Sequence, residues 1–458
     1  MLEPENNPNP PGIVDPSPFR RLLMARYLSR IASTKQIQKN KAKFENKRLA
    51  QKRPHVVEYF HQLDDPYSHL TAQVVARFAE RYDVEIIPHL IRARGGRNQP
   101  EKEKLASWAR RDAACIAPHY GLRFPEVAGV VPKPEVQHSA TLALAGLDSD
   151  GFLSEIERIS TDLWFDEEAA HSESSNADAI EALDKGSARL AELGHYSGAT
   201  FYYGGEWYWG VDRLFHLEQR LRELGACEVP QEPYIVSRPD IDVTGVDASG
   251  LELHFYPSLN SPYTSIIYDR TIALVDACNI KFHHKPVLPM IMRGVPATRA
   301  KAKYIFFDTK READFFGVPF GNHVSPIGTP TRLAYSLLPW AALQGKDRQL
   351  LSTLLRHAWA QGRGLHRTSN MKRAVQEAGL DWNEAQKRLG SDEWKEIVER
   401  IQDEMVEEMG LWGAFLPAHR PRWGTRSRGL GAGQIMACGG GNSPQGRTLY
   451  KLALMLDE

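Results

Sequence analysis

The sequence predicts an α/β protein in which one supersecondary plan is used twice. Three observations lead to this class. "VVEYFHQLDDPYSHL" (56–70) and "LELHFYPSLNSPYTSI" (251–266) share an extended run, a turn and Pro-Tyr followed by Ser or Thr. The same spacing of 196 residues separates Pro66 from Pro262 and, further on, Gly121 from Gly317. Each copy also opens with a strand, helix, strand pattern, which implies a mixed sheet flanked by helices.

The elements of each copy follow from the periodicity of the apolar residues. In both copies the opening strand is followed by a helix, a second strand and a long helical stretch, and the first copy then ends in two short strands and a helix. In the first copy these segments are "AQVVARFAERY" (72–82), "VEIIPHLI" (84–91), "ATFYYGG" (199–205), "EWYWG" (206–210) and "VDRLFHLEQRLREL" (211–224). In the second copy they are "IIYDRTIALVDAC" (266–278) and "IKFHHKPVL" (280–288).

Composition describes a globular chain without a marked preference for charged partners. Of 458 residues, 42% are hydrophobic and 25% charged, with 57 basic and 57 acidic side chains, so no nucleic-acid partner is expected. The length suggests two or three domains. The four cysteines are far apart and form no Cys-x-x-Cys pair, and the adjacent His283 and His284 point to opposite faces of a strand. We therefore expect no metal site and no redox pair.

The N-terminal region predicts disorder followed by a basic arm. Residues 1–18 are rich in Pro and Asn, whereas 19–53 are strongly basic, with Leu22, Leu23, Tyr27 and Ile31 at roughly helical spacing. A membrane or nucleic-acid arm is one interpretation, but a solvated helix docked by one apolar stripe is the commoner outcome. The acidic N-terminus is unlike a signal peptide and no apolar run approaches 18 residues, which predicts a soluble, cytoplasmic protein without a transmembrane segment.

Domain boundaries are expected where the copies begin and end. The predicted parts are a disordered and then basic arm (1–54), a first domain (55–228), a linker (229–249), a second domain (250–413) and a Gly/Arg-rich tail (414–458), with contacts between the two domains of the chain. The tail lacks strand periodicity, where the first copy continues with "WGVDRL" (209–214). Either it is a divergent disordered extension or the reading frame changes near codon 414.

Ser261 and Pro262 mark a strand-to-helix junction in the second copy. A serine hydroxyl caps a helix by accepting from an unpaired backbone N–H, and proline suits the first helical position. The same helix start can hold an anion, because its free N–H groups and the helix dipole point there. Structural capping and chemistry predict the same residues at this place.

The junction motif, "FGVPFG" (316–321) and "GATFYYGGEWYWGVDRL" (198–214) resemble thioredoxin-fold proteins of the DsbA-like superfamily. The nearest branch comprises 2-hydroxychromene-2-carboxylate isomerases and kappa-class glutathione transferases. The resemblance covers most of 55–225 and 250–413, so it implies two tandem thioredoxin-like (DsbA-like) domains, each with a helical insertion. It further implies glutathione as cofactor and a small aromatic substrate.

In that branch a serine replaces the first cysteine of the redox pair and donates to the glutathione thiolate. The resemblance gives this role to Ser261, and a helix N-terminus with a hydroxyl donor does favour a thiolate. The helix "KAKYIFFDTKREA" (301–313) resembles the helix beside the family's cleft. The residues that the resemblance places around glutathione are Pro262, Tyr263, Tyr304, Asp308 and Arg311, although Asp308 and Arg311 also fit a plain intrahelical ion pair.

The first copy departs from this pattern. Asp65 stands in the place of Ser261 and, when ionised, would repel a thiolate, so it is interpreted as a plain N-cap and the first domain as degenerate. Cys115 stands where the second copy has Arg311. Ala199 and Phe415 occupy the positions at which the family has a cis-proline, and we expect both peptide bonds to be trans.

Three functions are therefore compared. The first is a glutathione-dependent isomerase or transferase with its centre in the second domain. The second is a non-catalytic tandem thioredoxin-fold binding protein. The third, a DsbA-family disulfide oxidoreductase, matches the fold but lacks the chemistry, because Ser68 and Thr264 stand where the resolving cysteines belong.

Overall fold

The computed structural model describes residues 15–93, 102–126, 130–165, 174–238, 243–295, 297–409 and 418–419. The chain divides into two compact units, each considered separately below. The N-terminal unit comprises Lys39–Asp240 and Thr298–Tyr304, and the C-terminal unit comprises Met1–Gln38, Ile241–Ala297 and Ile305–Glu458.

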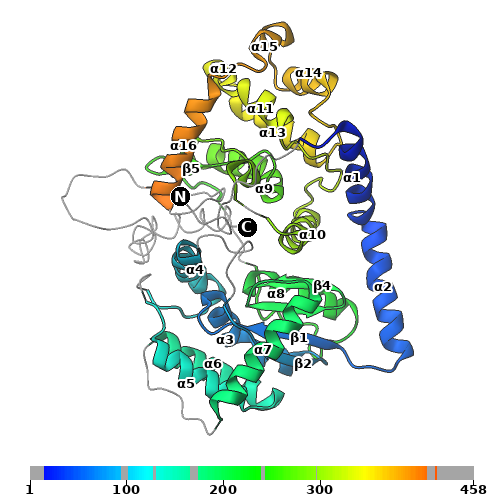
Figure 1. The fold of residues 1–458 in the computed structure, drawn as a ribbon, viewed down its shortest axis with the longest axis vertical. Helices are drawn as coiled ribbons and strands as arrows, with labels where there is room; N and C mark the ends of the chain where they lie inside the picture. Colours follow the sequence, from blue (N-terminus) through cyan, green and yellow to red (C-terminus); the bar gives the residue numbers. More distant parts are fainter. Residues whose placement is uncertain are drawn as a thin grey trace, which may run out of the picture. The chain divides into compact units, whose positions relative to one another are not determined.

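A four-stranded mixed sheet forms the centre of the N-terminal unit, in the order β2-β1-β3-β4 (Figure 1). β1 (Val56–His61) pairs in parallel with β2 (Glu85–Leu90) and antiparallel with β3 (Thr200–Tyr203), which pairs antiparallel with β4 (Glu206–Trp209). These strands and their mixed pairing confirm the sequence prediction for this part of the chain.

Helices cover both faces of this sheet because β1 is apolar on both. Val57 and Tyr59 face a large core cluster that includes residues of α3 and α8, whereas Phe60 faces a smaller cluster with Leu190 of α7. A strand buried on both faces reads as a continuous apolar run, as "VVEYF" nearly does. The helices of the unit are α3 (Pro66–Arg81), α4 (Lys102–Ile116), η2 (Ala117–Tyr120), α5 (Pro134–Ala145), α6 (Ser149–Phe165), α7 (Asn176–Leu193) and α8 (Val211–Glu223).

The C-terminal unit has a smaller sheet in the order β6-β5-β7. β5 (Glu252–Phe255) pairs in parallel with β6 (Lys281–His284) and antiparallel with the two-residue β7 (Ala418–His419). The rest of the predicted tail, 414–417 and 420–458, lies outside the described residues. The helices that belong wholly to the unit are α1 (Pro18–Ile31), α9 (Pro262–Ala277), η3 (Met290–Arg293), α11 (Thr329–Ser336), α12 (Leu338–Leu343), α13 (Asp347–Trp359), α14 (Thr368–Glu377), α15 (Trp382–Arg388) and α16 (Trp394–Met409).

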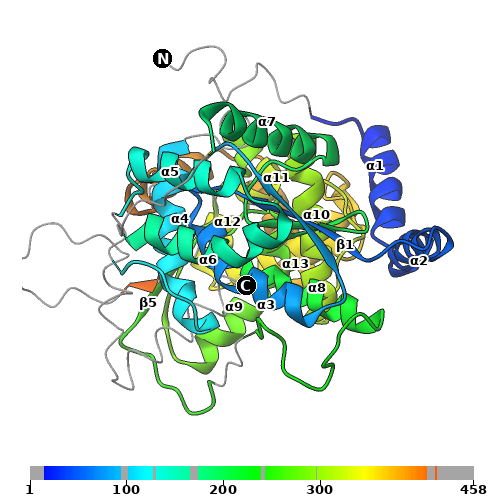
Figure 2. The same ribbon diagram turned by 90° about the horizontal axis from the view of Figure 1, so that it is seen from below.

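Two helices cross the division between the units. α2 (Thr34–Ala50) begins in the C-terminal unit and continues into the N-terminal one, and α10 (Arg299–Phe315) does the reverse. α1 and α2 are separate helices, drawn in blue in Figures 1 and 2.

The basic arm is docked through a face that the sequence did not indicate. Leu28 and Ile31 of α1 pack against the main core of the C-terminal unit, and the Arg21 side chain is buried there. Leu23 and Tyr27 of the expected apolar stripe are instead 49% and 58% exposed. The predicted stripe was therefore right for Ile31 and wrong for Leu23 and Tyr27, because the buried Arg21 and Leu28 turn a different part of the helix to the core.

The buried Arg21 guanidinium finds hydrogen-bond acceptors within the C-terminal unit. Its guanidinium donates to the backbone carbonyls of Pro16, Ser325 and Ile327 and pairs with Asp15 at 2.5 Å. A buried charge is tolerated when its donors are satisfied in this way. The arrangement fixes the start of α1 to the loop before α11.

The two parallel ladders have the same register at a constant offset. Val56 pairs with Glu85 and Glu252 pairs with Lys281, so both strands shift by 196 positions (252 − 56 and 281 − 85). Gly121 and Gly317, separated by the same offset, have positive φ angles of 65° and 68°, a conformation that glycine adopts freely.

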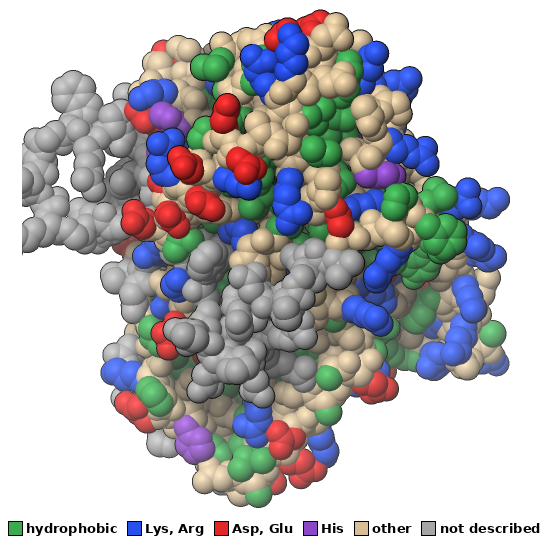
Figure 3. Space-filling model, turned by 45° about the horizontal axis from the view of Figure 1, so that its top comes forward, with side chains coloured by type: hydrophobic (Ala, Val, Ile, Leu, Met, Phe, Trp, Pro, Cys, Tyr) green, Lys and Arg blue, Asp and Glu red, His purple; other side chains and the backbone are tan. Residues whose placement is uncertain are grey.

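No helix among the described residues is long and apolar enough to cross a membrane. Acidic and basic side chains both occur on the face drawn in Figure 3, and Lys and Arg gather at its right edge, where Figure 1 places α1 and α2. This distribution agrees with an even overall charge that is locally basic in the arm.

Candidate functional site

The start of α9 forms the predicted junction. Ser261 is its N-cap, with extended backbone (φ −89°, ψ 121°), and its Oγ accepts from the Thr264 amide at 3.2 Å. Pro262 occupies the first turn, where a missing N–H costs nothing. Ser261 as a whole residue is half-buried, and its hydroxyl is held at the start of the helix by the Thr264 amide.

Two acceptor atoms beside Ser261 have no hydrogen-bond partner within the described part of the chain. Ser258 Oγ and Asn260 Oδ1 are both buried in this way. A buried polar atom without a partner costs free energy, and such atoms are uncommon in folded proteins. They are an observation that favours a ligand at the helix start, and sequence periodicity gave no signal for them.

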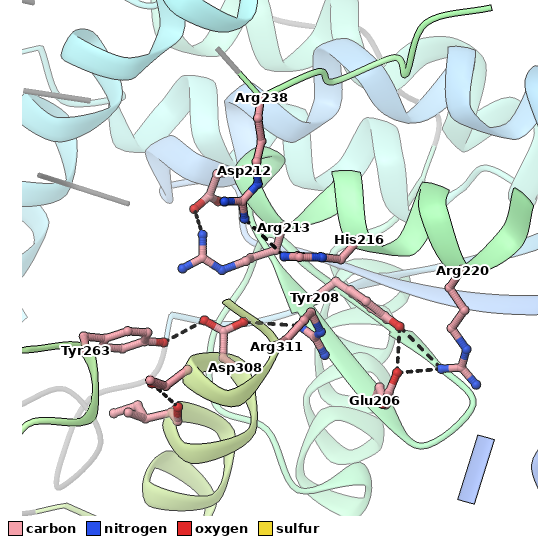
Figure 4. A network of polar contacts seen from close by, with 12 residues as sticks. Glu206, Tyr208, Asp212, Arg213, His216, Arg220, Arg238, Tyr263, Asp308 and Arg311 are labelled. Atoms are coloured by element: carbon pink, nitrogen blue, oxygen red, sulfur yellow. Dashed lines mark hydrogen bonds and ion pairs between the residues drawn. The ribbon is translucent and has the colours of Figure 1, made fainter. Parts of the chain in front are cut away.

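A second polar group links α9 to α10. Tyr263 donates its hydroxyl hydrogen to Asp308 Oδ2 at 2.8 Å, and Arg311 donates to Asp308 Oδ1 at 3.2 Å (Figure 4). The Asp308 carboxylate is buried, and each of its oxygens accepts one of these hydrogen bonds. The structure thus brings together three of the residues expected around glutathione, Tyr263, Asp308 and Arg311, whereas their role in binding stays a prediction.

Tyr304 lies one turn earlier on α10, in the part of that helix assigned to the N-terminal unit. Its ring makes edge contacts with His195 and Trp209, at centroid distances of 4.9 and 5.9 Å. Aromatic edge contacts of this kind stabilise packing. Tyr304 thus lies among aromatic side chains of the N-terminal unit.

The N-terminal unit repeats the junction with different chemistry. Asp65 is the N-cap of α3, and its Oδ2 accepts from the Ser68 amide at 3.0 Å and the Ser68 hydroxyl at 2.8 Å. Tyr67 donates to Asp112 Oδ2 at 2.6 Å, as Tyr263 does to Asp308. Asp65 is therefore an N-cap, as predicted.

The raised pKa values of Asp65 and Asp112 were not predicted from the sequence. Burial raises the pKa of Asp65 to about 7, although the Ser68 hydrogen bonds lower it. Burial also raises the pKa of Asp112 to about 6; the Tyr67 hydrogen bond opposes this shift and the charge of Asp212 adds to it. Asp65 therefore changes its charge near pH 7 and Asp112 near pH 6, and the desolvation that causes these shifts is not visible in a sequence.

A tight loop lies against the start of α3. A Cβ on Gly198 would come within 2.7 Å of Gln62 Cβ and 2.9 Å of Ser68 Oγ. The next residue, Ala199, is buried with a positive φ of 55°, and every described peptide bond is trans, which confirms the expectation for Ala199. Phe415 lies outside the described residues.

Three of the four cysteines lie within the described residues. Cys115 and Cys227 are half-buried, and burial raises the pKa of the buried Cys278 thiol. A raised pKa keeps a thiol protonated and unreactive. Cys438 lies outside the described residues.

A hollow of about 440 Å³ lies along β6 of the C-terminal unit. Its lining comes from β6 and the residue after it, the start of α13 and the middle of α16, and it includes His283, Lys285 and Arg400. Ser261, Tyr263, Asp308 and Arg311 are not among its lining residues.

Comparisons with known proteins place a DsbA-like thioredoxin domain in the C-terminal part of the chain. Residues 252–414 match the family model described as DSBA-like thioredoxin domain. No curated protein matches the chain.

Two solved structures are similar to about a third of the chain. A 2-hydroxychromene-2-carboxylate isomerase is 20% identical over 37% of this chain and 96% of its own, with a TM-score of 0.28. A probable DsbA oxidoreductase from Streptomyces coelicolor is 16% identical over 37% of this chain and 80% of its own, with a TM-score of 0.30.

Proposed function

We propose that the C-terminal unit is a glutathione-dependent isomerase or transferase of the 2-hydroxychromene-2-carboxylate isomerase type, with Ser261 stabilising the thiolate. The observation that carries the proposal is the hydroxyl of the half-buried Ser261 at the α9 N-terminus, next to the unpartnered Ser258 Oγ and Asn260 Oδ1. A tripeptide offers both backbone and ammonium donors for such acceptor atoms.

Ser261 is suited to hold a thiolate for a specific reason. Its Oγ already accepts from the Thr264 amide, which leaves the hydroxyl hydrogen to be donated to a bound sulfur. A hydrogen bond to a charged group contributes roughly 1.5 to 3 kcal/mol. The positive end of the helix dipole adds to this effect.

Tyr263, Asp308 and Arg311 would line the cofactor side of the site. Asp308 holds the Tyr263 hydroxyl and one Arg311 nitrogen, which orients both side chains. Guanidinium nitrogens are good partners for a peptide carboxylate. Pro262 would shape the helix start, and Tyr304 remains a proposed neighbour of the cofactor.

The substrate class that we propose is a small aromatic catabolite carrying an enone. Glutathione, when bound, supplies a thiol that adds reversibly to the carbon–carbon double bond of the enone. The protein's part is to keep that thiol ionised, through the hydrogen bond from Ser261 and the positive end of the α9 dipole.

We also propose that the N-terminal unit is a second, degenerate copy of the same fold. Support comes from the common ladder register, the equivalent Tyr–Asp hydrogen bonds and the equivalent N-caps at Asp65 and Ser261. The Asp65 carboxyl accepts from Ser68 and repels a thiolate when it is ionised, and a Cβ on Gly198 would lie 3.3 Å from Asp65 Oδ2. This unit would therefore not activate a thiol.

A non-catalytic tandem binding protein is the second candidate. Two observations favour it. Position 199 is alanine where the family has a cis-proline, and the loop at Gly198 packs closely against the start of α3. Dithiol exchange is not proposed, since Asp65 with Ser68 and Ser261 with Thr264 occupy the cysteine positions.

Calorimetric titration of the full chain with glutathione tests the proposal, followed by turnover assays with and without glutathione. We expect binding in the wild type and at least a tenfold loss in Ser261→Ala. Ser261→Asp is the sharper variant, because aspartate keeps the N-cap, as Asp65 does, but repels a thiolate.

Ser265→Ala is the matched control, because Ser265 lies one turn further along α9 and its hydroxyl donates to the Pro262 carbonyl at 2.6 Å. Glutathione binding that is equally strong in Ser261→Asp and Ser265→Ala would remove Ser261 from the mechanism. The absence of any binding heat in the wild type would favour the non-catalytic candidate.

A further inference from the structure

Three potential metal ligands converge on one face of the β5-β6 pair in the C-terminal unit. One ligand atom each of Glu252, His254 and His283 lies within 4.8 Å of the others. His254 and His283 are directly paired across the parallel ladder, and Glu252 precedes His254 by two positions on the same strand. Side chains two apart on a strand share a face, so the register itself assembles the group.

The opposite face of these strands is apolar, and this fixes the direction in which the Glu252 and His254 side chains point. Leu253 and Phe255 belong to the hydrophobic cores of the unit. Because strand side chains alternate, Glu252 and His254 must project from the other face. His284, the neighbour of His283 in sequence, lies on the apolar side, whereas the cross-strand partner His254 is 29 positions away and was not predicted.

The donor atoms are close and accessible. His283 Nε2 lies 2.8 Å from Glu252 Oε2, and His254 Nε2 lies 4.0 Å from the same oxygen. The two imidazole rings are edge to face at a centroid distance of 4.4 Å. The three side chains are between 14% and 32% exposed, so an ion in solution can reach them.

We propose that Glu252, His254 and His283 form a site for a divalent transition ion such as Zn²⁺. Two imidazoles and one carboxylate are a ligand set that zinc accepts, with a fourth position left for water or an exogenous ligand. Of the three ligands, His283 also lines the hollow along β6. This inference does not depend on the proposed glutathione chemistry.

Two lysines limit the affinity of this site. Lys281 donates to Glu252 Oε1 at 2.6 Å, which leaves Oε2 for the ion. Lys285 Nζ lies 2.9 Å from His254 Nδ1 and also bonds to Glu404, which offers the lysine a partner when an ion repels it. Removing the Lys285 charge should therefore strengthen ion binding, whereas a merely coincidental cluster would not respond in this way.

The N-terminal unit supplies a natural comparison. At the positions equivalent to His254 and His283 it has Glu58 and Ile87, and the Glu58 carboxylate is taken by Arg189 and His89. The bidentate arginine leaves no oxygen of Glu58 free for an ion. The proposed site is thus confined to the C-terminal copy of the ladder.

The test uses the untagged full chain, titrated with Zn²⁺ by calorimetry and with Co²⁺ by visible absorption. We expect one ion per chain, with binding weakened at least tenfold in His254→Gln and in His283→Gln, and tightened by roughly tenfold in Lys285→Met. His284→Gln, on the opposite face, is the control and should leave binding unchanged. Thermal unfolding of each variant establishes that it is folded.

Two results would overturn the proposal. One is that the wild type binds no ion in a one-to-one ratio. The other is that one-to-one binding persists unchanged in the folded His254→Gln and His283→Gln variants, which would place the ion elsewhere on the chain. If His254→Gln does not fold, Glu252→Gln provides the same test, because it removes the charged ligand and keeps the size of the side chain.

Discussion

Tyr67 on α3 donates its hydroxyl hydrogen to the buried carboxyl of Asp112 on α4 at 2.6 Å. Tyr67→Phe removes the donor without opening a cavity, and it leaves Asp112 desolvated. We expect a loss of about 1 to 3 kcal/mol in the free energy of unfolding at pH 7.5. The loss should be smaller at pH 5, because the pKa of Asp112 is about 6 and the carboxyl is protonated there.

Urea unfolding followed by tryptophan fluorescence at the two pH values measures this difference. Tyr263→Phe is the corresponding variant in the C-terminal unit. An equal loss at both pH values would show that the hydrogen bond does not sense the ionisation of Asp112.

Asp65 makes stability depend on pH in the direction opposite to an ordinary paired carboxylate. Its pKa in the folded protein, about 7, exceeds the ordinary value of 3.8, so the folded state binds more protons between these values. The free energy of unfolding should therefore fall as the pH rises from about 4 to about 7. Asp65→Asn retains the N-cap and should flatten this slope, as measured by urea unfolding across the range.

Asp64→Asn is the control for this prediction. Asp64 is the neighbouring carboxylate, and its charge is one of the causes that raise the pKa of Asp65. We expect its removal to change the slope less than Asp65→Asn does. A wild-type stability that rises steadily between pH 4 and 7 would contradict the assignment of a raised pKa to Asp65.

Gly198→Ala should destabilise the N-terminal unit by about 1 to 3 kcal/mol, as overpacked sites do. The added Cβ would stand 2.7 Å from Gln62 Cβ, too close for any side chain. Calorimetric thermal unfolding provides the measurement. Gly250→Ala is the control, since its Cβ would meet nothing within 4 Å; equal melting temperatures for the two variants would argue against close packing of this loop.

Arg21→Met should release the start of α1. The substitution leaves the Ser325 and Ile327 carbonyls without their donor and removes the partner of Asp15, a change that costs roughly 3 to 5 kcal/mol for a buried pair. Limited proteolysis should cut within α1 several times faster than in the wild type. Arg20→Met, at the exposed neighbouring position, should be cut at the wild-type rate.

Much of the fold could be predicted from local pattern. The strand, helix, strand openings, the paired strands from Thr200 to Trp209 and the junction at Ser261 all follow from alternation, turn residues and capping chemistry. The resemblance named Tyr263 and Asp308 as neighbours of one site, but their hydrogen bond to each other was not predicted.

The remainder depends on tertiary structure. The pKa of Asp65 is set by desolvation, the anchoring role of Arg21 by carbonyls that lie about three hundred residues away, and the pairing of His254 with His283 by ladder register. None of these relations is local in sequence. Residue types alone therefore indicated where a site could lie. They did not indicate which of its polar atoms would lack a hydrogen-bond partner, or which side chains would contact each other.

The two-residue β7 also has a bearing on how the chain can be shortened. Ala418 and His419 supply the backbone pairing on one side of β5, and β6 supplies it on the other. A protein ending at residue 409 would present β5 with a bare row of amide and carbonyl groups, the template along which foreign strands add. Shortened versions made for crystallisation should therefore keep residue 419, because without it Glu252 and Leu253 would lose their antiparallel partners and a strand of another molecule could pair there.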